Sequence, residues 1–139
     1  MRSILVPDNS TTISCPICMS SVEAGFPSPA EDYIEGSLDL NRYLIKHPAA
    51  TFFIQASGDS MINAGIHPGD ILIVDRSLEA IDKKIVIAVI DGVFTVKRLR
   101  YRDSLILLEP ENENYYPIII TEEKSFAIWG VVTNVIHKV

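Results

Sequence analysis

The sequence predicts a mostly β protein, with a compact β domain preceded by an extended N-terminal arm. From Thr51 onward, short segments rich in isoleucine, valine, phenylalanine and threonine recur at intervals typical of strands. The residues before Thr51 instead hold five of the eight prolines and show no pattern that would build a core. A length of 139 residues suits one ordinary domain. We therefore expect an arm over residues 1–50 and a β domain over residues 51–139.

The arm offers one candidate helix. Over residues 33–45, four apolar side chains roughly suit one helical face, although Gly36 weakens the pattern: Ile34, Leu38, Leu44 and Ile45. Prolines and glycines interrupt the rest of the arm. We expect one short helix within an otherwise extended segment.

The β domain divides into short strands separated by turn signals. The turn signals are residues 68–70, the pair Asp91-Gly92 and the polar stretch 109–114. Asp91-Gly92 lies between two β-branched runs, which is a strong signal for a two-residue hairpin. Strands at this spacing favour a mostly antiparallel sheet that is closed or coiled. The expected strands are 51–56, 71–75, 84–91, 93–99, 104–108, 118–121 and 126–136.

Composition excludes several classes of protein. Hydrophobic residues make up 47% of the chain and charged residues 22%, a globular balance. The net charge of −6, from 18 acidic and 12 basic residues, argues against direct nucleic-acid binding, which usually requires a basic face. The longest apolar runs, such as residues 85–90, fall far short of the roughly 20 residues of a membrane span. No basic-then-apolar leader opens the chain, so we expect a soluble, cytoplasmic protein.

The cysteines and histidines predict no metal or cofactor site. Cys15 and Cys18 form one C-x-x-C pair, whereas a tetrahedral zinc site needs four ligands. His47, His67 and His137 show no ligand spacing relative to the cysteines or to one another. We expect two reduced thiols and neither a metal nor a cofactor.

The first candidate functional segment surrounds Ser60. Residues 58–62 begin like a nucleophile elbow, but Ile62 stands where the second glycine belongs, which disfavours a Ser-His-Asp hydrolase. The small residues of the segment 56–61 would let a substrate backbone approach Ser60 closely. They would also leave backbone N–H groups free to point at a single position beside Ser60. The alternative is an ordinary turn in which Asp59 or Ser60 caps a short helix.

The second candidate is Lys97, within a predicted strand. Period-two alternation places Lys97 on one face with Val93, Thr95 and Leu99. Burial on that face would disfavour the ammonium form and lower the lysine pKa, which would make Lys97 a usable general base. The alternative is a solvated lysine on the strand surface.

Several motifs, in this order, resemble the LexA/UmuD family of self-cleaving serine–lysine peptidases. The resemblance covers nearly the whole chain and is weakest over residues 1–21. It implies the compact β domain of LexA and the signal peptidases. The motifs are Gly-Phe-Pro-Ser-Pro-Ala at 25–30, Asp-Leu-Asn at 39–41, Ala-Ser-Gly-Asp-Ser-Met at 56–61, Gly-Asp at 69–70, Phe-Thr-Val-Lys at 94–97 and Gly-Val-Val at 130–132.

The resemblance also implies roles for individual residues. Ser60 is the nucleophile, Lys97 is its general base, and the bond that is cleaved joins Ala24 to Gly25. A neutral lysine can replace histidine in activating a serine. Backbone N–H groups of Ser60 and Met61 would form the oxyanion hole.

The biology that the resemblance implies is regulatory. In the SOS response to DNA damage, a RecA filament on single-stranded DNA stimulates self-cleavage, and the shortened product forms a homodimer. This dimer joins a UmuC-type subunit in a translesion DNA polymerase. Two alternatives remain: a LexA-like regulator, for which the acidic arm provides no DNA-binding element, and a non-catalytic β domain that only binds partners.

Overall fold

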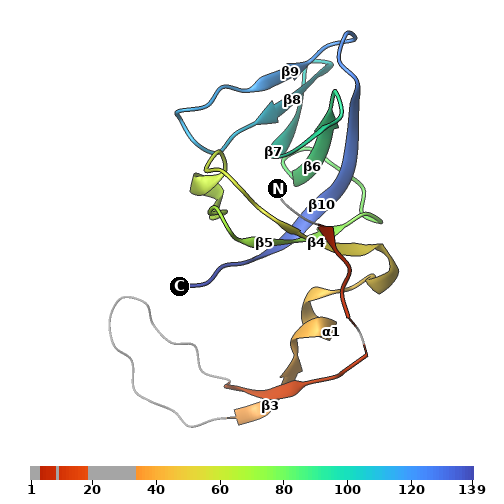
Figure 1. Ribbon diagram of the computed structural model, residues 1–139, viewed down its shortest axis with the longest axis vertical. Coiled ribbons are helices and arrows are strands. Elements are labelled where there is room, and N and C mark those ends of the chain that lie inside the picture. The colour runs from red at the N-terminus through yellow and green to blue at the C-terminus, as the bar shows by residue number, and fades with distance from the viewer. Residues whose placement is uncertain (1–3, 9, 19–33) are drawn as a thin grey trace. The chain divides into compact units, whose positions relative to one another are not determined.

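The computed structural model describes residues 4–8, 10–18 and 34–139 (Figure 1). The chain divides into two compact units. One unit holds the described residues up to Pro7 together with His47–Val139, and the other spans Asp8–Lys46. The expected boundary at residue 50 lies near this division. The first described residues nevertheless belong with the β domain, because β1 (Ile4–Leu5) pairs with β4 (Thr51–Gln55).

The larger unit is built on one antiparallel sheet of eight strands in the order β1-β4-β5-β10-β6-β7-β8-β9. The mostly β fold predicted from the sequence is therefore confirmed. Among the described residues the strand order does not close, so β1 and β9 remain at the edges. Besides β1 and β4, the strands are β5 (Ile71–Asp75), β6 (Ile85–Ile90), β7 (Val93–Arg102), β8 (Leu105–Glu109), β9 (Ile118–Ile120) and β10 (Phe126–Ile136). Two short 3₁₀ turns, η1 (Pro48–Ala50) and η2 (Ile62–Ala64), flank β4.

Two tight hairpins set the register of the strand that carries Lys97. Asp91 and Gly92 have φ angles of +48° and +80°, the left-handed pair of a type I′ turn, as their sequence predicts. β7 and β8 are joined by a similar turn, in which Asp103 and Ser104 have φ angles of +48° and +68°. This second turn contains no glycine and lacks the usual sequence signal.

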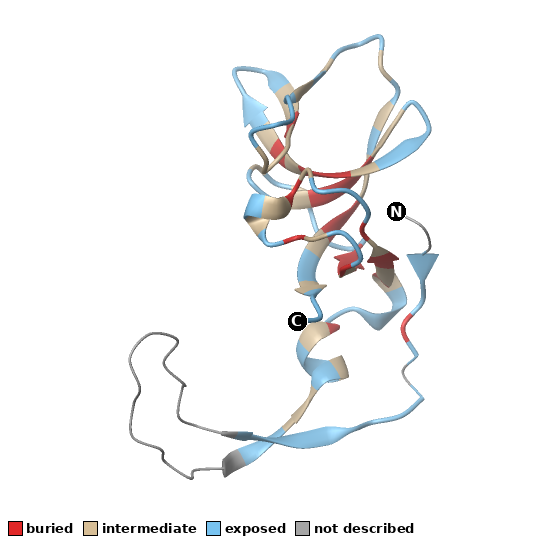
Figure 2. Ribbon diagram, turned by 60° about the vertical axis from the view of Figure 1, so that its left-hand side comes forward, coloured by how far each residue is buried: buried red, intermediate tan, exposed pale blue. Residues whose placement is uncertain are grey.

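The core consists of two clusters of buried side chains, which Figure 2 shows as red segments along the strands. Alternate residues of β6 contribute to different clusters, because successive side chains of a strand point to opposite faces. One cluster contains Ile54, Ala56, Met61, Ile66, Leu72, Val74, Ile87 and Val96. The other contains Val86, Ala88, Leu99, Leu108 and Val131.

The smaller unit contains a two-stranded sheet and a short helix. β2 (Ser14–Cys18) pairs with β3 (Ile34–Asp39), and α1 follows over Leu40–Leu44. The side chain of Asp39 caps the helix by accepting from Asn41 N at 3.1 Å. The expected helix over residues 33–45 was therefore too long. Its first half is a strand, because pairing with β2 satisfies its backbone, and Gly36 suits that extended conformation.

No helix in the described ranges is long and apolar enough to cross a membrane.

Candidate active site

Ser60 lies in a turn anchored at both ends by buried side chains. After β4, Ala56 is 3% exposed, and Met61, which immediately follows Ser60, is 2% exposed. Gly58, between these anchors, has a φ angle of +79°, which a residue with a side chain rarely adopts. Ser60 itself remains partly exposed. The turn thus presents its hydroxyl from a fixed backbone.

The alternative of an ordinary capping turn does not fit this geometry. Met61 occupies the N-cap position of η2, and no side-chain hydrogen bond caps that turn. The side chain of Asp59 contacts the hydroxyl of Tyr115 instead.

Lys97 projects from β7 onto Ser60. Its Nζ lies 2.9 Å from Ser60 Oγ, 3.0 Å from Thr95 Oγ1 and 3.0 Å from the carbonyl oxygen of Val96. Thr95 and Lys97 share a face of β7, as the alternation predicts, because they are two residues apart in a strand. The strand and the turn therefore bring together a hydroxyl and an amine that are 37 residues apart in the chain.

The electrostatic setting of Lys97 favours its neutral form. The residue is only 9% exposed, which excludes the alternative of a solvated strand lysine. Burial lowers the pKa of the Lys97 ammonium from its ordinary value of 10.5. Within the described part of the chain, no carboxylate forms an ion pair with Lys97 that would raise the pKa again.

The three contacts of Lys97 can be made by an ammonium, which has three N–H donors, and also by a neutral amine. The Val96 carbonyl can only accept a hydrogen bond, and the Thr95 hydroxyl oxygen can accept a second one. A neutral amine has two N–H donors and one lone pair. With both donors used, the lone pair remains for the proton of the Ser60 hydroxyl.

The sequence pattern of the peptidase S24-like family matches residues 16–133. The chain belongs to this family. Protein SamA of Salmonella typhimurium is 47% identical over 139 residues, covering 99% of this chain and 96% of SamA. Protein ImpA of Escherichia coli is 50% identical over 127 residues, covering 88% of this chain and 83% of ImpA. LexA repressor 1 of Geobacter sulfurreducens is 39% identical over 132 residues, covering 94% of this chain and 64% of the repressor.

These similarities confirm the relationship to the LexA/UmuD family that the motifs predict. The chain is a UmuD-like member of the S24-like family of serine peptidases and of the SOS response.

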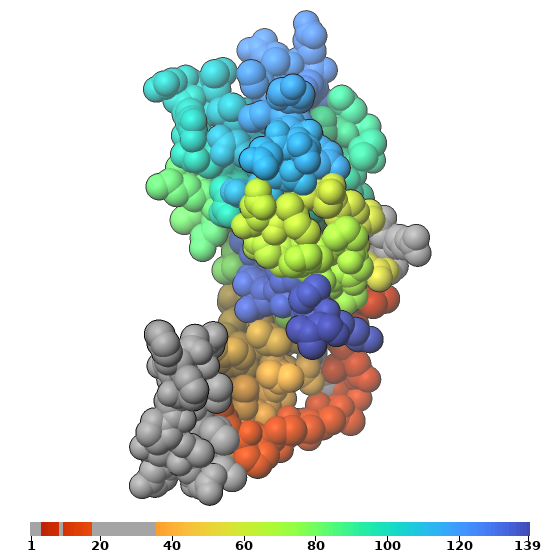
Figure 3. All heavy atoms as spheres, turned by 90° about the vertical axis from the view of Figure 1, so that its left-hand side faces the viewer, coloured from red at the N-terminus to blue at the C-terminus, as the bar shows by residue number. Residues whose placement is uncertain are grey.

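The candidate site includes a second loop, within the polar stretch 109–114 that the sequence predicts only as a turn. Glu111, between β8 and β9, donates its backbone N–H to Ser60 O at 2.8 Å and accepts from Asn63 N at 2.8 Å. Asn112 donates its side-chain amide to Asp59 O at 2.9 Å. In Figure 3 the yellow segment around residue 60 lies directly against the sky-blue segment between β8 and β9. This loop fixes the backbone on both sides of the nucleophile candidate.

Ser60 and Met61, the residues expected to form the oxyanion hole through their backbone N–H groups, are consecutive in the turn before η2. Ala24 and Gly25, the expected cleavage site, lie outside the described residues.

A group of side chains separate from Ser60 and Lys97 resembles a metal site. In the described ranges, one group of three side chains has the composition to hold a metal ion: His67, Asp70 and His137. Sequence spacing alone did not indicate this group, because His67 and His137 lie at opposite ends of the β domain's sequence.

Proposed function

We propose that this S24-like protein cleaves its own chain between Ala24 and Gly25, with Ser60 as nucleophile and Lys97 as general base. The observation that carries the proposal is the 2.9 Å separation of Lys97 Nζ from Ser60 Oγ in a place where the lysine is buried. A serine hydroxyl is a weak nucleophile until a base takes its proton. Burial lowers the pKa of Lys97, so a larger fraction of the amine is neutral and can act as such a base.

The reaction divides into acylation and deacylation. Ser60 Oγ attacks the carbonyl carbon of Ala24 while Lys97 Nζ takes the hydroxyl proton. The bond to the nitrogen of Gly25 then breaks, and the Lys97 ammonium returns the proton to that leaving amine. In the second half, Lys97 takes a proton from water, the water oxygen attacks the ester carbonyl, and Ser60 Oγ leaves with the proton. The products are a carboxylate at Ala24 and a free amino group at Gly25.

The surrounding residues suit the charge that develops in this reaction. The carbonyl oxygen of Ala24 becomes negative in the tetrahedral intermediate, and the N–H groups of Ser60 and Met61 would stabilise it. Thr95 Oγ1 and Val96 O hold Nζ in place while it becomes charged. Ala24 and Gly25 are small, so that the cleaved segment can approach the nucleophile closely.

The proposed biological role follows from the UmuD-like relationship. A RecA filament on single-stranded DNA stimulates the cleavage, and the product Gly25–Val139 forms a homodimer. The homodimer joins a UmuC-type polymerase subunit for translesion synthesis in the cytoplasm. The protein itself contacts no nucleic acid in this scheme, in keeping with its net charge of −6.

Intact-mass spectrometry after incubation at alkaline pH tests the chemistry. We expect two fragments that meet at the Ala24–Gly25 bond, and none from Ser60→Ala or Lys97→Ala. If the wild type stays whole, the incubation is repeated with RecA, nucleotide and single-stranded DNA. A chain that remains intact in both incubations refutes the proposal and favours a β domain that only binds partners. Cleavage of either variant refutes the roles assigned to Ser60 and Lys97.

A further inference from the structure

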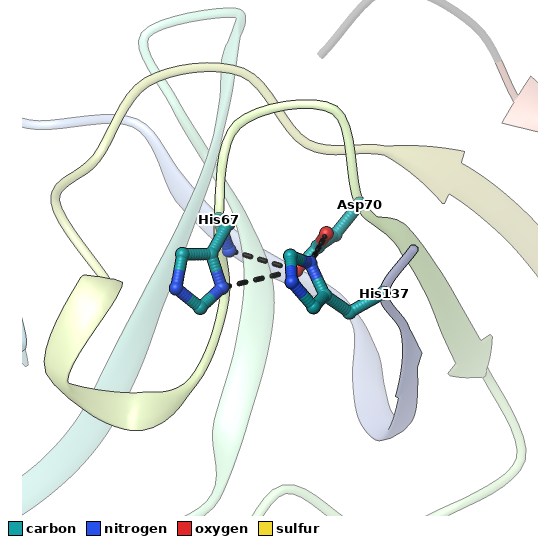
Figure 4. A group of neighbouring side chains, drawn as sticks. All are labelled: His67, Asp70 and His137. Carbon is teal, nitrogen blue, oxygen red and sulfur yellow. Dashed lines mark hydrogen bonds and ion pairs between the residues drawn. The ribbon is translucent and has the colours of Figure 1, made fainter. Parts of the chain in front are cut away.

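Two histidines from distant parts of the chain meet at one buried carboxylate (Figure 4). His137 Nδ1 lies 2.6 Å from Asp70 Oδ1, and His67 Nδ1 lies 3.7 Å from Asp70 Oδ2. The two imidazole rings are 4.5 Å apart between centroids. The Asp70 side chain is 4% exposed, whereas the histidine side chains are 43% and 44% exposed. A buried carboxylate therefore faces one ring nitrogen from each of two partly exposed histidines.

The fold holds this cluster rigidly at its carboxylate. Gly69 N donates to Ala56 O and Ala56 N donates to Asp70 O, both at 2.8 Å, which fixes the turn before β5 to the end of β4. His67 N donates to Asp70 Oδ2 at 2.8 Å and orients the carboxylate. The register of β10 with β5 places Ile136 opposite Ile71, and so brings His137 beside Asp70.

One nitrogen of the cluster lacks a hydrogen-bond partner among the described residues. This atom, His67 Nδ1, is buried. At 3.7 Å, its distance to Asp70 Oδ2 is too long for a hydrogen bond. Buried polar atoms nearly always have a partner, so this nitrogen, facing the same carboxylate as His137 Nδ1, points to a missing ligand.

We propose that His67 Nδ1, Asp70 and His137 Nδ1 bind a divalent transition-metal ion of the zinc class. The three ligand atoms lie within 4.8 Å of one another. A tetrahedral ion with bonds of about 2.0–2.2 Å separates its ligand atoms by roughly 3.3–3.5 Å. The two observed distances, 2.6 and 3.7 Å, lie on either side of that separation. Rotation of the two partly exposed imidazoles would adjust both distances to this separation.

The donor set determines which ions fit. Two imidazoles and one carboxylate suit Zn²⁺, Co²⁺, Ni²⁺ or Cu²⁺, whereas Mg²⁺ and Ca²⁺ prefer oxygen ligands alone. Three protein ligands leave a position for water. A metal-bound imidazole nitrogen carries no hydrogen, so binding through His137 Nδ1 requires the tautomer with its hydrogen on Nε2.

The bound ion would tie the end of β10 to the turn that supports Ala56. Ala56 begins the segment that leads to Ser60, so the metal would stabilise the backbone that carries the nucleophile candidate. Metal binding is nevertheless independent of the proposed cleavage chemistry and is measured without it.

The test titrates Co²⁺ and Zn²⁺ into the full-length chain carrying Ser60→Ala, Cys15→Ser and Cys18→Ser, which keeps the chain whole and removes the thiols. His47→Gln is the matched control. Its Nδ1 also lies 2.6 Å from a buried carboxylate, that of Asp75, but no second histidine joins them among the described residues. Calorimetry reports affinity and stoichiometry, and the visible spectrum of Co²⁺ reports its coordination.

We expect one ion per chain in the parent and in His47→Gln, and an affinity at least about tenfold lower in His67→Gln and in His137→Gln. Zn²⁺ should raise the melting temperature of the parent but not of His137→Gln, a change just beyond β10 that leaves the core intact. The proposal is wrong if the parent binds neither ion at submillimolar concentration. It is equally wrong if His47→Gln weakens binding as much as the other two substitutions, or if these two have no effect.

Discussion

Thr95→Val tests how the Lys97 amine is positioned. Thr95 Oγ1 is one of three atoms at hydrogen-bond distance from Lys97 Nζ. Valine keeps the β-branched shape of threonine but lacks the hydroxyl. The substitution therefore removes one acceptor from the amine and leaves the strand and the Ser60 turn in place.

The magnitude follows from the change in charge on Nζ during the reaction. Before proton transfer, Thr95 accepts from a neutral amine, a bond with a net contribution of about 1 kcal/mol. After proton transfer it accepts from an ammonium, a bond with a contribution of about 2 kcal/mol. Only the difference of about 1 kcal/mol affects the barrier, so cleavage should slow about fivefold.

The pH dependence distinguishes this positioning role from a merely structural one. Because Thr95 stabilises the ammonium more than the amine, its removal lowers the pKa of Lys97 further. The midpoint of the rate–pH curve of Thr95→Val should therefore shift to lower pH, while the plateau at alkaline pH drops. A substitution that only loosens the fold would not move the midpoint.

The assay follows the fraction of intact chain with time by mass spectrometry, from pH 6 to about pH 11 to span the ordinary lysine range. Thr133→Val is the matched control, because Thr133 is also a strand threonine whose hydroxyl forms a hydrogen bond, donating to a backbone carbonyl, Ile73 O, at 3.3 Å. Its rate and midpoint should equal those of the wild type. An unchanged rate and midpoint in Thr95→Val, or equal slowing in Thr133→Val, would refute the positioning role.

Three further predictions concern the same domain. Wild-type cleavage should accelerate as pH rises through the lowered pKa of Lys97, and a flat profile by the same assay contradicts a lysine base. Lys97→Met should be at least as stable as wild type to urea at neutral pH. The difference in stability between this variant and the wild type should narrow as the pH rises toward 10.5. At pH values between the lowered pKa of Lys97 in the folded chain and its ordinary pKa in the unfolded chain, the unfolded wild type binds more protons than the folded one. A rise in pH through this range therefore stabilises the folded wild type. Gly130→Ala should lower the free energy of unfolding by about 1–3 kcal/mol, because the added Cβ would lie 2.6 Å from Val74 Cγ1. Urea titration measures this change, and an unchanged midpoint of unfolding contradicts the close packing.

Local patterns predicted most of the sheet. β-branched runs and Asp91-Gly92 specify structure over a few residues, and the corresponding strands and hairpin are confirmed. The same local reasoning was wrong for the first half of the expected helix at residues 33–45. That segment pairs with β2, and pairing between distant segments leaves no periodic signal in either one.

The candidate site, too, was only partly predictable from local sequence patterns. Alternation placed Lys97 on the same face as Thr95, but only the resemblance assigned it to Ser60, because no local rule relates a turn to a strand 37 residues away. The meeting of His67 with His137 had no sequence signal, because it depends on the register of β10 with β5. Contacts set by sheet topology become visible only in the folded chain.

The loop between β8 and β9 explains how such a long-range site keeps its geometry. Glu111 bonds through its backbone to the Ser60 turn and through its carboxylate to Arg98, the residue after Lys97. One residue thus joins the backbone of the nucleophile candidate to the strand of the base candidate. Because both partners are held by the same loop, a displacement of the loop would move the turn and the strand together. The distance between the Ser60 hydroxyl and the Lys97 amine therefore depends on the contacts of Glu111 as well as on the strand register. Loop residues that take no part in the proposed reaction thus belong to the site.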